Sequence, residues 1–197
     1  DKHVLNTSGA WAPAAPPLAG DRTVAVLGLG ALGRAAGTAL AQLGFHVVGW
    51  SRSAKDIPSI ECYHGESGLS EALAKAEIAV LLLPNTPDTE NLLNAERLRL
   101  LPQGAVILNP GRGSLIDDEA LLAALDDGHI GHATLDVFRN EPLPSEHPYW
   151  RHARVTVTPH IASETRPGSA SRTIAVNIKR GEDGAPFLHL VDREKGY

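Results

Sequence analysis

The sequence lacks several features on which whole classes of protein depend. Its 197 residues include one cysteine, Cys62, which excludes an internal disulfide framework and fits a reducing compartment. The net charge is -5 without a basic cluster, so we expect no nucleic-acid partner. The longest apolar run, residues 78–83, suits a buried strand rather than a membrane span. We therefore expect no signal peptide, no membrane attachment and a cytoplasmic location.

Short apolar segments alternate with helical patterns from Thr23 onward. The predicted strands are residues 24–27, 46–50, 78–83, 105–109, 133–137 and 155–158, and the predicted helices are 31–43, 69–75 and 117–127. Strands of this kind lack polar alternation, which is typical of a parallel sheet covered on both faces. The sequence therefore predicts an α/β fold, a Rossmann doubly wound parallel sheet.

The two ends of the sequence differ from this central pattern. Residues 1–20 carry three prolines and no periodicity, which predicts a linker or an extended arm. Residues 21–165 hold the predicted nucleotide-binding domain. After Thr165 we expect only a tail, so residues 166–197 are too few for a second domain.

A Gly-x-Gly-x-x-Gly pattern lies between the first predicted strand and helix. Gly28 permits a tight turn, Gly30 lets the backbone approach a pyrophosphate, and Gly33 lets the helix pack closely on the strand. Backbone N–H groups at Ala31 and Leu32, together with the helix dipole, favour phosphate binding there. Dinucleotide binding is the better interpretation in this context, with a methyltransferase loop as the main alternative.

The segment after the second strand indicates which dinucleotide. It reads Ser51-Arg52-Ser53, where a carboxylate usually binds the ribose of NAD. An arginine fork can bind a 2′-phosphate through two charged hydrogen bonds, and the serine hydroxyls add donors. We expect NADP(H), with NAD possible; a solvated loop arginine is the alternative interpretation.

Three polar segments follow later strands and should meet at one edge of the sheet. They read "LNPGRGSLID" (108–117), "LDVFRNEPLP" (135–144) and "VTVTPHIA" (155–162). Arg112, on a bare backbone between two glycines, can bind a substrate carboxylate. His160 can donate a proton to a ketone oxygen, and Glu141 can orient the imidazole. Asp136 can accept a hydrogen bond from the nicotinamide carboxamide or cap the following turn.

Each residue alone has an ordinary structural alternative, but three of them on successive strand-end loops favour catalysis. Other chemistries have less support. His129 and His132 lack thiol or acidic companions at ligand spacing, so we expect no metal site. We expect Cys62 to be an inert packed thiol, and no Gly-x-Ser-x-Gly elbow indicates a hydrolase.

At these residues the sequence resembles the D-2-hydroxyacid dehydrogenase family, and most of all its glyoxylate/hydroxypyruvate reductase branch. The matching stretches are "VLGLGALG", "WSRS", "LLLPNTPDT", "LNPGRG", "ALLAALDDGHI", "LDVFRNEPLP", "VTVTPHIA" and "VDREKGY". The resemblance implies a catalytic trio of Arg112, Glu141 and His160, NADPH as reductant, glyoxylate and hydroxypyruvate as substrates, and a homodimer. The predicted cofactor-binding residues are Gly28, Gly30, Ala31, Leu32, Gly33, Ser51, Arg52, Ser53, Leu83, Pro84, Asn109, Pro110, Gly111, Asp136 and Ala162.

The resemblance also implies an N-terminal substrate domain that is almost wholly absent. Residues 12–17 then mark the crossover from it, and residues 166–197 return to it. Without that domain we expect NADPH binding with poor turnover, because an open cleft does not exclude water. A dinucleotide-sensing protein of the corepressor type, or an NAD-dependent relative such as a phosphoglycerate or formate dehydrogenase, remain alternatives.

Overall fold

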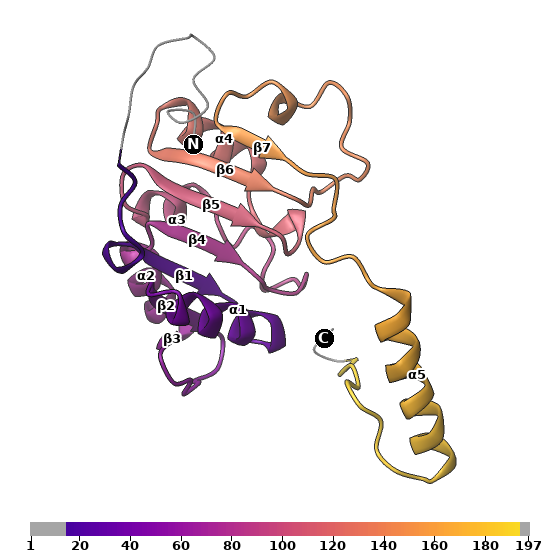
Figure 1. Cartoon of the computed structure of the whole chain (residues 1–197). Helices are drawn as coiled ribbons and strands as arrows, with labels where there is room; N and C mark the ends of the chain where they lie inside the picture. The colour runs from indigo at the N-terminus through magenta and orange to yellow at the C-terminus, as the bar shows by residue number, and fades with distance from the viewer. Residues whose placement is uncertain (1–14, 194–197) are drawn as a thin grey trace.

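Seven strands form one parallel sheet in the computed structural model, which describes residues 15–193 (Figure 1). They are β1 (Thr23–Leu27), β2 (His46–Ser51), β3 (Glu61–His64), β4 (Ile78–Leu81), β5 (Ala105–Asn109), β6 (Ile130–Leu135) and β7 (Val155–Val157). Their order is β3-β2-β1-β4-β5-β6-β7, and every neighbouring pair is parallel. The chain reverses its direction of growth after β3, as the predicted doubly wound fold requires.

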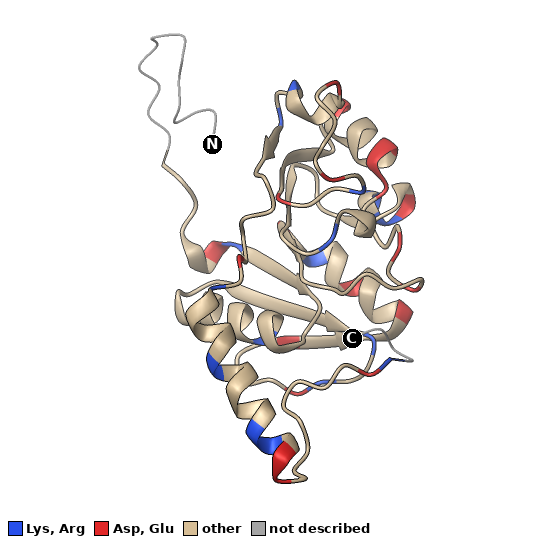
Figure 2. Cartoon of the chain, turned by 90° about the vertical axis from the view of Figure 1, so that its right-hand side faces the viewer, with Lys and Arg blue, Asp and Glu red and all other residues tan. Residues whose placement is uncertain are grey.

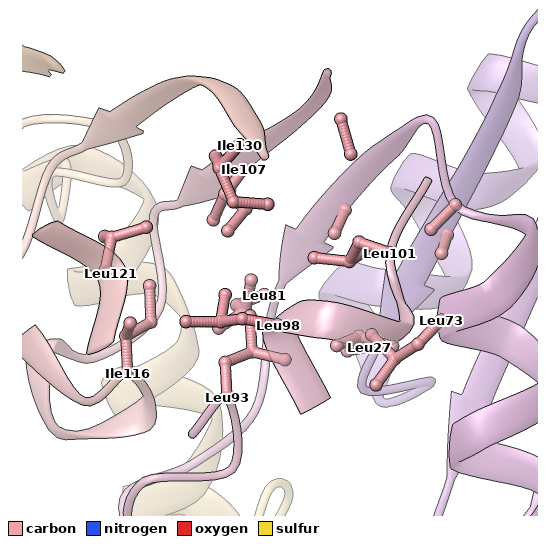
Figure 3. Close-up of a cluster of buried hydrophobic side chains, with 14 of the residues drawn as sticks. Leu27, Leu73, Leu81, Leu93, Leu98, Leu101, Ile107, Ile116, Leu121 and Ile130 are labelled. Atoms are coloured by element: carbon pink, nitrogen blue, oxygen red, sulfur yellow. The ribbon is translucent and has the colours of Figure 1, made fainter. Parts of the chain in front are cut away.

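Helices cover the sheet unequally. The helices are α1 (Ala31–Gln42), α2 (Gly65–Lys75), α3 (Ala95–Leu100), α4 (Asp118–Asp126) and α5 (Pro167–Glu182), with short 3₁₀ turns η1 (Ala19–Asp21), η2 (Gly113–Leu115) and η3 (Pro148–Trp150). Side chains of α2, α3 and α4 pack in one buried cluster with β1, β4 and β5. Figure 3 shows Leu27 and Leu81 from the sheet beside Leu73 and Leu98 from the helices. A smaller cluster lies on the opposite face, where α1 packs on β1 and β2.

Local sequence explains where several elements begin and end. Asp117 caps α4, because its carboxylate accepts a hydrogen bond from the Ala120 N–H at 3.1 Å. Gly44 and Gly128 follow α1 and α4 with φ of 92° and 78°, the left-handed conformation that ends a helix at low cost for glycine. Charged residues of both signs are interspersed over the described chain (Figure 2).

The structure corrects several predicted boundaries. β6 begins earlier and ends earlier than residues 133–137, β4 ends at Leu81 rather than residue 83, and α2 begins four residues before residue 69. Within residues 21–165, the strand β3 and the helix α3 were not predicted. β3 is a four-residue edge strand with no buried residue, and α3 has six residues, so neither gives a strong periodic signal.

The segment after Thr165 is more than the expected tail. It contains the 16-residue helix α5, which extends away from the sheet in Figure 1 and has no buried residue. The following segment folds back on this helix, because the Asn177 amide exchanges hydrogen bonds with Leu188 N and O and Arg180 donates to the Pro186 carbonyl. Residues 1–14 of the predicted linker and residues 194–197 lie outside the described part. Within residues 15–193, no helix has the length and apolarity to span a membrane.

Candidate active site

The predicted glycine turn joins β1 to α1 as the sequence indicates. Gly28 has φ of 109°, and a Cβ there would lie 2.6 Å from the Leu82 carbonyl oxygen. A Cβ at Gly33 would lie 1.8 Å from the Gly28 carbonyl oxygen, so only glycine lets α1 pack this closely on the turn. Gly30 differs from both, since a Cβ there would meet nothing within 4 Å. The turn is therefore tightly packed at Gly28 and Gly33 and open at Gly30.

The open side of this turn, at Gly30, is also the start of α1. Gly30 is the N-cap residue and supplies no side-chain cap to the first N–H groups of the helix. Ala31 and Leu32 are exposed, whereas Gly33 is buried. Uncapped N–H groups at a helix start, with the positive end of its dipole, suit an anion such as a pyrophosphate.

The loop after β2 holds the residues predicted to bind the 2′-phosphate of NADP(H). Ser51 is buried and its Oγ donates to the Ser53 carbonyl oxygen at 2.8 Å, so this hydroxyl fixes the turn. Ser53 and Arg52 are exposed. Arg52 Nη1 lies 3.1 Å from Asp88 Oδ2, a carboxylate from the segment after β4. Leu83 and Pro84 lie near the start of that segment and are half-buried, and a Cβ at Gly28 would lie 3.1 Å from the Leu83 N atom.

The loop after β5 carries Arg112 on a tightly packed backbone. Asn109 is 2% exposed; its Oδ1 accepts from Gly111 N at 3.1 Å and its Nδ2 donates to the Arg112 carbonyl at 2.8 Å. Arg112 itself is exposed, and its Nη1 donates to the Gly111 carbonyl at 2.6 Å. Pro110 is half-buried in the same turn.

The glycines beside Arg112 make room for protein rather than for a ligand. A Cβ at Gly111 would lie 2.7 Å from the Leu81 carbonyl oxygen, and one at Gly113 would lie 2.0 Å from the Phe138 carbonyl carbon. The expected bare backbone open to close approach is therefore corrected: both glycines are buried against neighbouring strands and loops. Gly113 brings the loop of Arg112 directly onto the loop after β6.

Glu141 and His160 meet across the loops after β6 and β7. Glu141 Oε2 lies 2.7 Å from His160 Nδ1, and Glu141 Oε1 accepts from the Phe138 N–H at 2.8 Å. Partial burial alone would raise the pKa of the Glu141 carboxyl, but these hydrogen bonds and the nearby charges of His160 and Arg112 lower it below its ordinary value. The carboxylate therefore stays ionised and holds the Nδ1 proton of the imidazole, leaving Nε2 as the nitrogen that can exchange a proton.

Asp136 organises the loop that carries His160. The side chain is 4% exposed and accepts hydrogen bonds from Thr158 Oγ1 at 2.5 Å, Ile161 N at 3.0 Å and Ala162 N at 2.9 Å. Its carbonyl oxygen accepts from the His160 N–H at 2.8 Å. Burial alone would raise the pKa of Asp136, but the three hydrogen bonds keep it below the ordinary value. Asp136 thus has the capping role, while its contact with a nicotinamide carboxamide stays a prediction.

These positions divide the candidate residues into two groups along one edge of the sheet. Arg112, Glu141 and His160 follow β5, β6 and β7 respectively. The charges of Arg112 and His160 both lower the pKa of Glu141. The glycine turn and Arg52 follow β1 and β2 farther along the same edge.

Residues 4–162 match the family described as D-isomer specific 2-hydroxyacid dehydrogenase, NAD binding domain. The chain belongs to this family.

Relatives within the dehydrogenase family cover all of the chain. It is 42% identical over 197 residues to the glyoxylate/hydroxypyruvate reductase A of Salmonella newport, a match that covers 100% of the chain and 63% of that relative. The chain therefore spans 63% of the length of this curated relative.

Solved structures of the dehydrogenase family have the same fold. A D-isomer specific 2-hydroxyacid dehydrogenase from Xanthobacter autotrophicus Py2, in complex with NADPH and MES, is 49% identical with a TM-score of 0.93, over 96% of the chain and 78% of that structure. An NADPH-dependent glyoxylate/hydroxypyruvate reductase from Sinorhizobium meliloti, in complex with NADP and sulfate, is 38% identical with a TM-score of 0.94, over 98% and 63% respectively.

In this dehydrogenase domain Arg139 links three strand-end loops, a role that the sequence did not reveal. Its guanidinium donates to the Ile116 carbonyl at 2.8 Å and the Ser114 carbonyl at 3.2 Å, and also to Asn91 Oδ1. These partners follow β4 and β5, whereas Arg139 follows β6. Because all of these contacts are distant in sequence, no local pattern could have indicated them.

Residues considered for a metal site lie elsewhere. His129 Nε2 lies 3.0 Å from the Leu98 carbonyl oxygen, and His132 Nε2 lies 2.9 Å from Thr156 Oγ1. Within residues 15–193 no group of three potential metal ligands comes together. Cys62 is a free, half-buried thiol on β3.

Proposed function

We propose that the protein reduces small 2-keto acids with NADPH, glyoxylate to glycolate and hydroxypyruvate to D-glycerate. The observation that carries the proposal is the 2.7 Å contact between His160 Nδ1 and Glu141 Oε2, on the same sheet edge as Arg112 and the open glycine turn. An acid–base pair and a carboxylate-binding cation beside a dinucleotide site are what this reaction needs from the protein.

The residues at the glycine turn fit a dinucleotide phosphate. Gly30 has open space where a side chain would stand, and the start of α1 has no side-chain cap. We assign the pyrophosphate to this turn and the 2′-phosphate to Arg52 and the serines beside it. Relatives from Xanthobacter and Sinorhizobium were solved with NADPH and NADP, which supports NADPH over NADH. When bound, NADPH supplies the hydride for C2 of the keto acid.

The three strand-end residues then have separate roles. Arg112 binds the substrate carboxylate through its guanidinium fork and holds the keto carbon in place. His160 donates the Nε2 proton to the carbonyl oxygen as that oxygen gains negative charge. Glu141 holds His160 through Nδ1 and stabilises the protonated imidazole. The same groups run the reverse oxidation with His160 as base.

Loss of NADPH absorbance with glyoxylate or hydroxypyruvate tests this assignment. With the full-length protein we expect turnover by the wild type and a decrease of about 10²–10⁴-fold in kcat for His160→Ala, because the general acid is lost. Glu141→Gln should lower kcat with little change in NADPH affinity. His46→Ala is the matched control, since His46 begins β2 at the opposite edge of the sheet and should leave the rates unchanged.

Three results would contradict the proposal. Full turnover by His160→Ala would remove the acid from this site. NADPH binding by the full-length protein without turnover of either acid would favour the dinucleotide-sensing alternative, and a strong preference for NADH would favour an NAD-dependent relative. The homodimer and the cytoplasmic location stay predictions; sedimentation of the purified chain measures the first.

A further inference from the structure

A carboxylate from another loop reaches Arg52 at the end of β2. Arg52 Nη1 lies 3.1 Å from Asp88 Oδ2. Arg52 follows β2 and Asp88 follows β4, and these two strands are the neighbours of β1 in the sheet. The ion pair therefore links the two loops on either side of the glycine turn, which follows β1.

Buried hydroxyls fix the turns on which both charges stand. Ser51, 8% exposed, closes the turn of Arg52 through its bond to the Ser53 carbonyl. Thr89, 9% exposed, closes the turn of Asp88, because its Oγ1 donates to the Pro84 carbonyl at 2.7 Å and accepts from a backbone N–H at 2.9 Å. The backbone on each side is thus set before any ligand binds.

The charged heads, in contrast, remain accessible. The side chains of Arg52 and Asp88 are 56% and 72% exposed. An exposed ion pair of this kind shifts an equilibrium by only about two- to fivefold. A dianionic phosphate can therefore take the guanidinium from the carboxylate at small cost, but it then remains near the negative charge of Asp88.

We propose that Asp88 is a specificity-determining residue, which competes with the 2′-phosphate of NADPH for Arg52 and so weakens the preference for NADPH over NADH. The inference deepens the proposed function and rests on it. NADH lacks the phosphate and leaves the pair of Arg52 and Asp88 intact. The segment after β2 has no carboxylate at the position that usually binds the ribose of NAD. A carboxylate, that of Asp88, comes instead from the loop after β4 and pairs with Arg52.

Calorimetric titration of NADPH and NADH tests the assignment without any turnover. Asp88→Asn keeps the shape of the side chain and removes its charge, so NADPH should bind about two- to fivefold more tightly while NADH is unchanged. The fragments 2′,5′-ADP and ADP should show the same contrast. The gain should shrink as salt is raised, because exposed charges are screened.

Two further variants separate a local effect from a general one. In an Arg52→Ala background the Asp88→Asn change should have no effect on NADPH affinity, since the competition requires the guanidinium. Asp127→Asn is the charge-matched control: Asp127 also pairs with an exposed arginine, Arg99, but it lies at the end of α4. This control should leave both affinities unchanged.

Each other result overturns the inference. Weaker NADPH binding by Asp88→Asn would make Asp88 a support for Arg52 rather than its competitor. An equal gain for NADH would indicate a general charge effect. If Asp88→Asn changes nothing while Arg52→Ala loses NADPH selectivity, the proposed function stands and this inference fails. If the wild-type chain binds neither dinucleotide, both fail.

Discussion

Replacing Asp136 by asparagine removes a buried negative charge from beneath the loop that carries His160. The carboxylate accepts hydrogen bonds from Thr158 Oγ1, Ile161 N and Ala162 N. An asparagine oxygen can keep the bonds on one side, but its NH₂ group then faces the Ala162 N–H, which is also a donor. One bond is lost and the others lose their charge assistance.

The size of the loss follows from these contacts. Hydrogen bonds to a charged group contribute about 1.5–3 kcal/mol and neutral ones about 0.5–1.5 kcal/mol, so Asp136→Asn should lower the free energy of unfolding by roughly 2–4 kcal/mol. Urea denaturation at neutral pH measures this directly. Asp126→Asn serves as the control, because Asp126 is exposed and its one ion pair within residues 15–193 is with His152, at 3.2 Å. We expect this change to lower the free energy of unfolding by about 0.5 kcal/mol or less.

The pH dependence gives a second, independent readout. The folded-state pKa of Asp136 lies below its ordinary value of 3.8, so its contribution is fully present above about that pH and is lost as the pH falls through the lower folded-state value. The stability gap between wild type and Asp136→Asn should therefore stay constant near neutrality and narrow below pH 3.8, as the wild-type carboxyl becomes neutral too. A gap under about 0.5 kcal/mol, or one that persists in acid, would refute the reasoning.

Three further substitutions have definite outcomes. Gly33→Ala places a Cβ 1.8 Å from the Gly28 carbonyl oxygen and should abolish NADPH binding in calorimetry; unchanged affinity would mean that the turn is not the phosphate site. Gly113→Ala places a Cβ 2.0 Å from the Phe138 carbonyl carbon and should lower the free energy of unfolding by about 1–3 kcal/mol in urea, whereas a neutral result would contradict the close loop contact. Arg139→Ala removes the link between three loops and should destabilise the chain by about 2 kcal/mol, with Arg139→Lys no better in the same assay because lysine lacks the fork.

The parts of the fold that the sequence predicted are those whose signal is local. β5 was predicted with its observed bounds, because an apolar run that ends in a polar turn has few other structures available. The glycine turn was also predicted, since its spacing reflects contacts within one strand–turn–helix unit. β3 was missed because half of its residues are exposed and it pairs with β2 alone, so its sequence carries no buried stripe.

The same distinction between local and long-range contacts explains which residues of the candidate site could be predicted. Arg112, Glu141 and His160 could be proposed together because parallel strands end at one edge, so sequence order alone brings their loops near each other. The contact between Glu141 and His160 follows from that placement. Arg139 and Asp88 could not be proposed, because which long side chain reaches which loop depends on packing that no local pattern encodes.

Gly113 shows why even a correct motif left its mechanism open. The sequence placed Arg112 between two glycines, and close approach of a ligand was a reasonable explanation for them. Either a ligand or a neighbouring backbone can require the absence of a Cβ, and the sequence does not distinguish the two. In the structure the neighbour is the backbone of Phe138, which lies three residues before Glu141 in the loop after β6. The glycine therefore serves the candidate site indirectly: it lets the loop of Arg112, the proposed carboxylate-binding residue, rest on the loop of Glu141, which contacts His160.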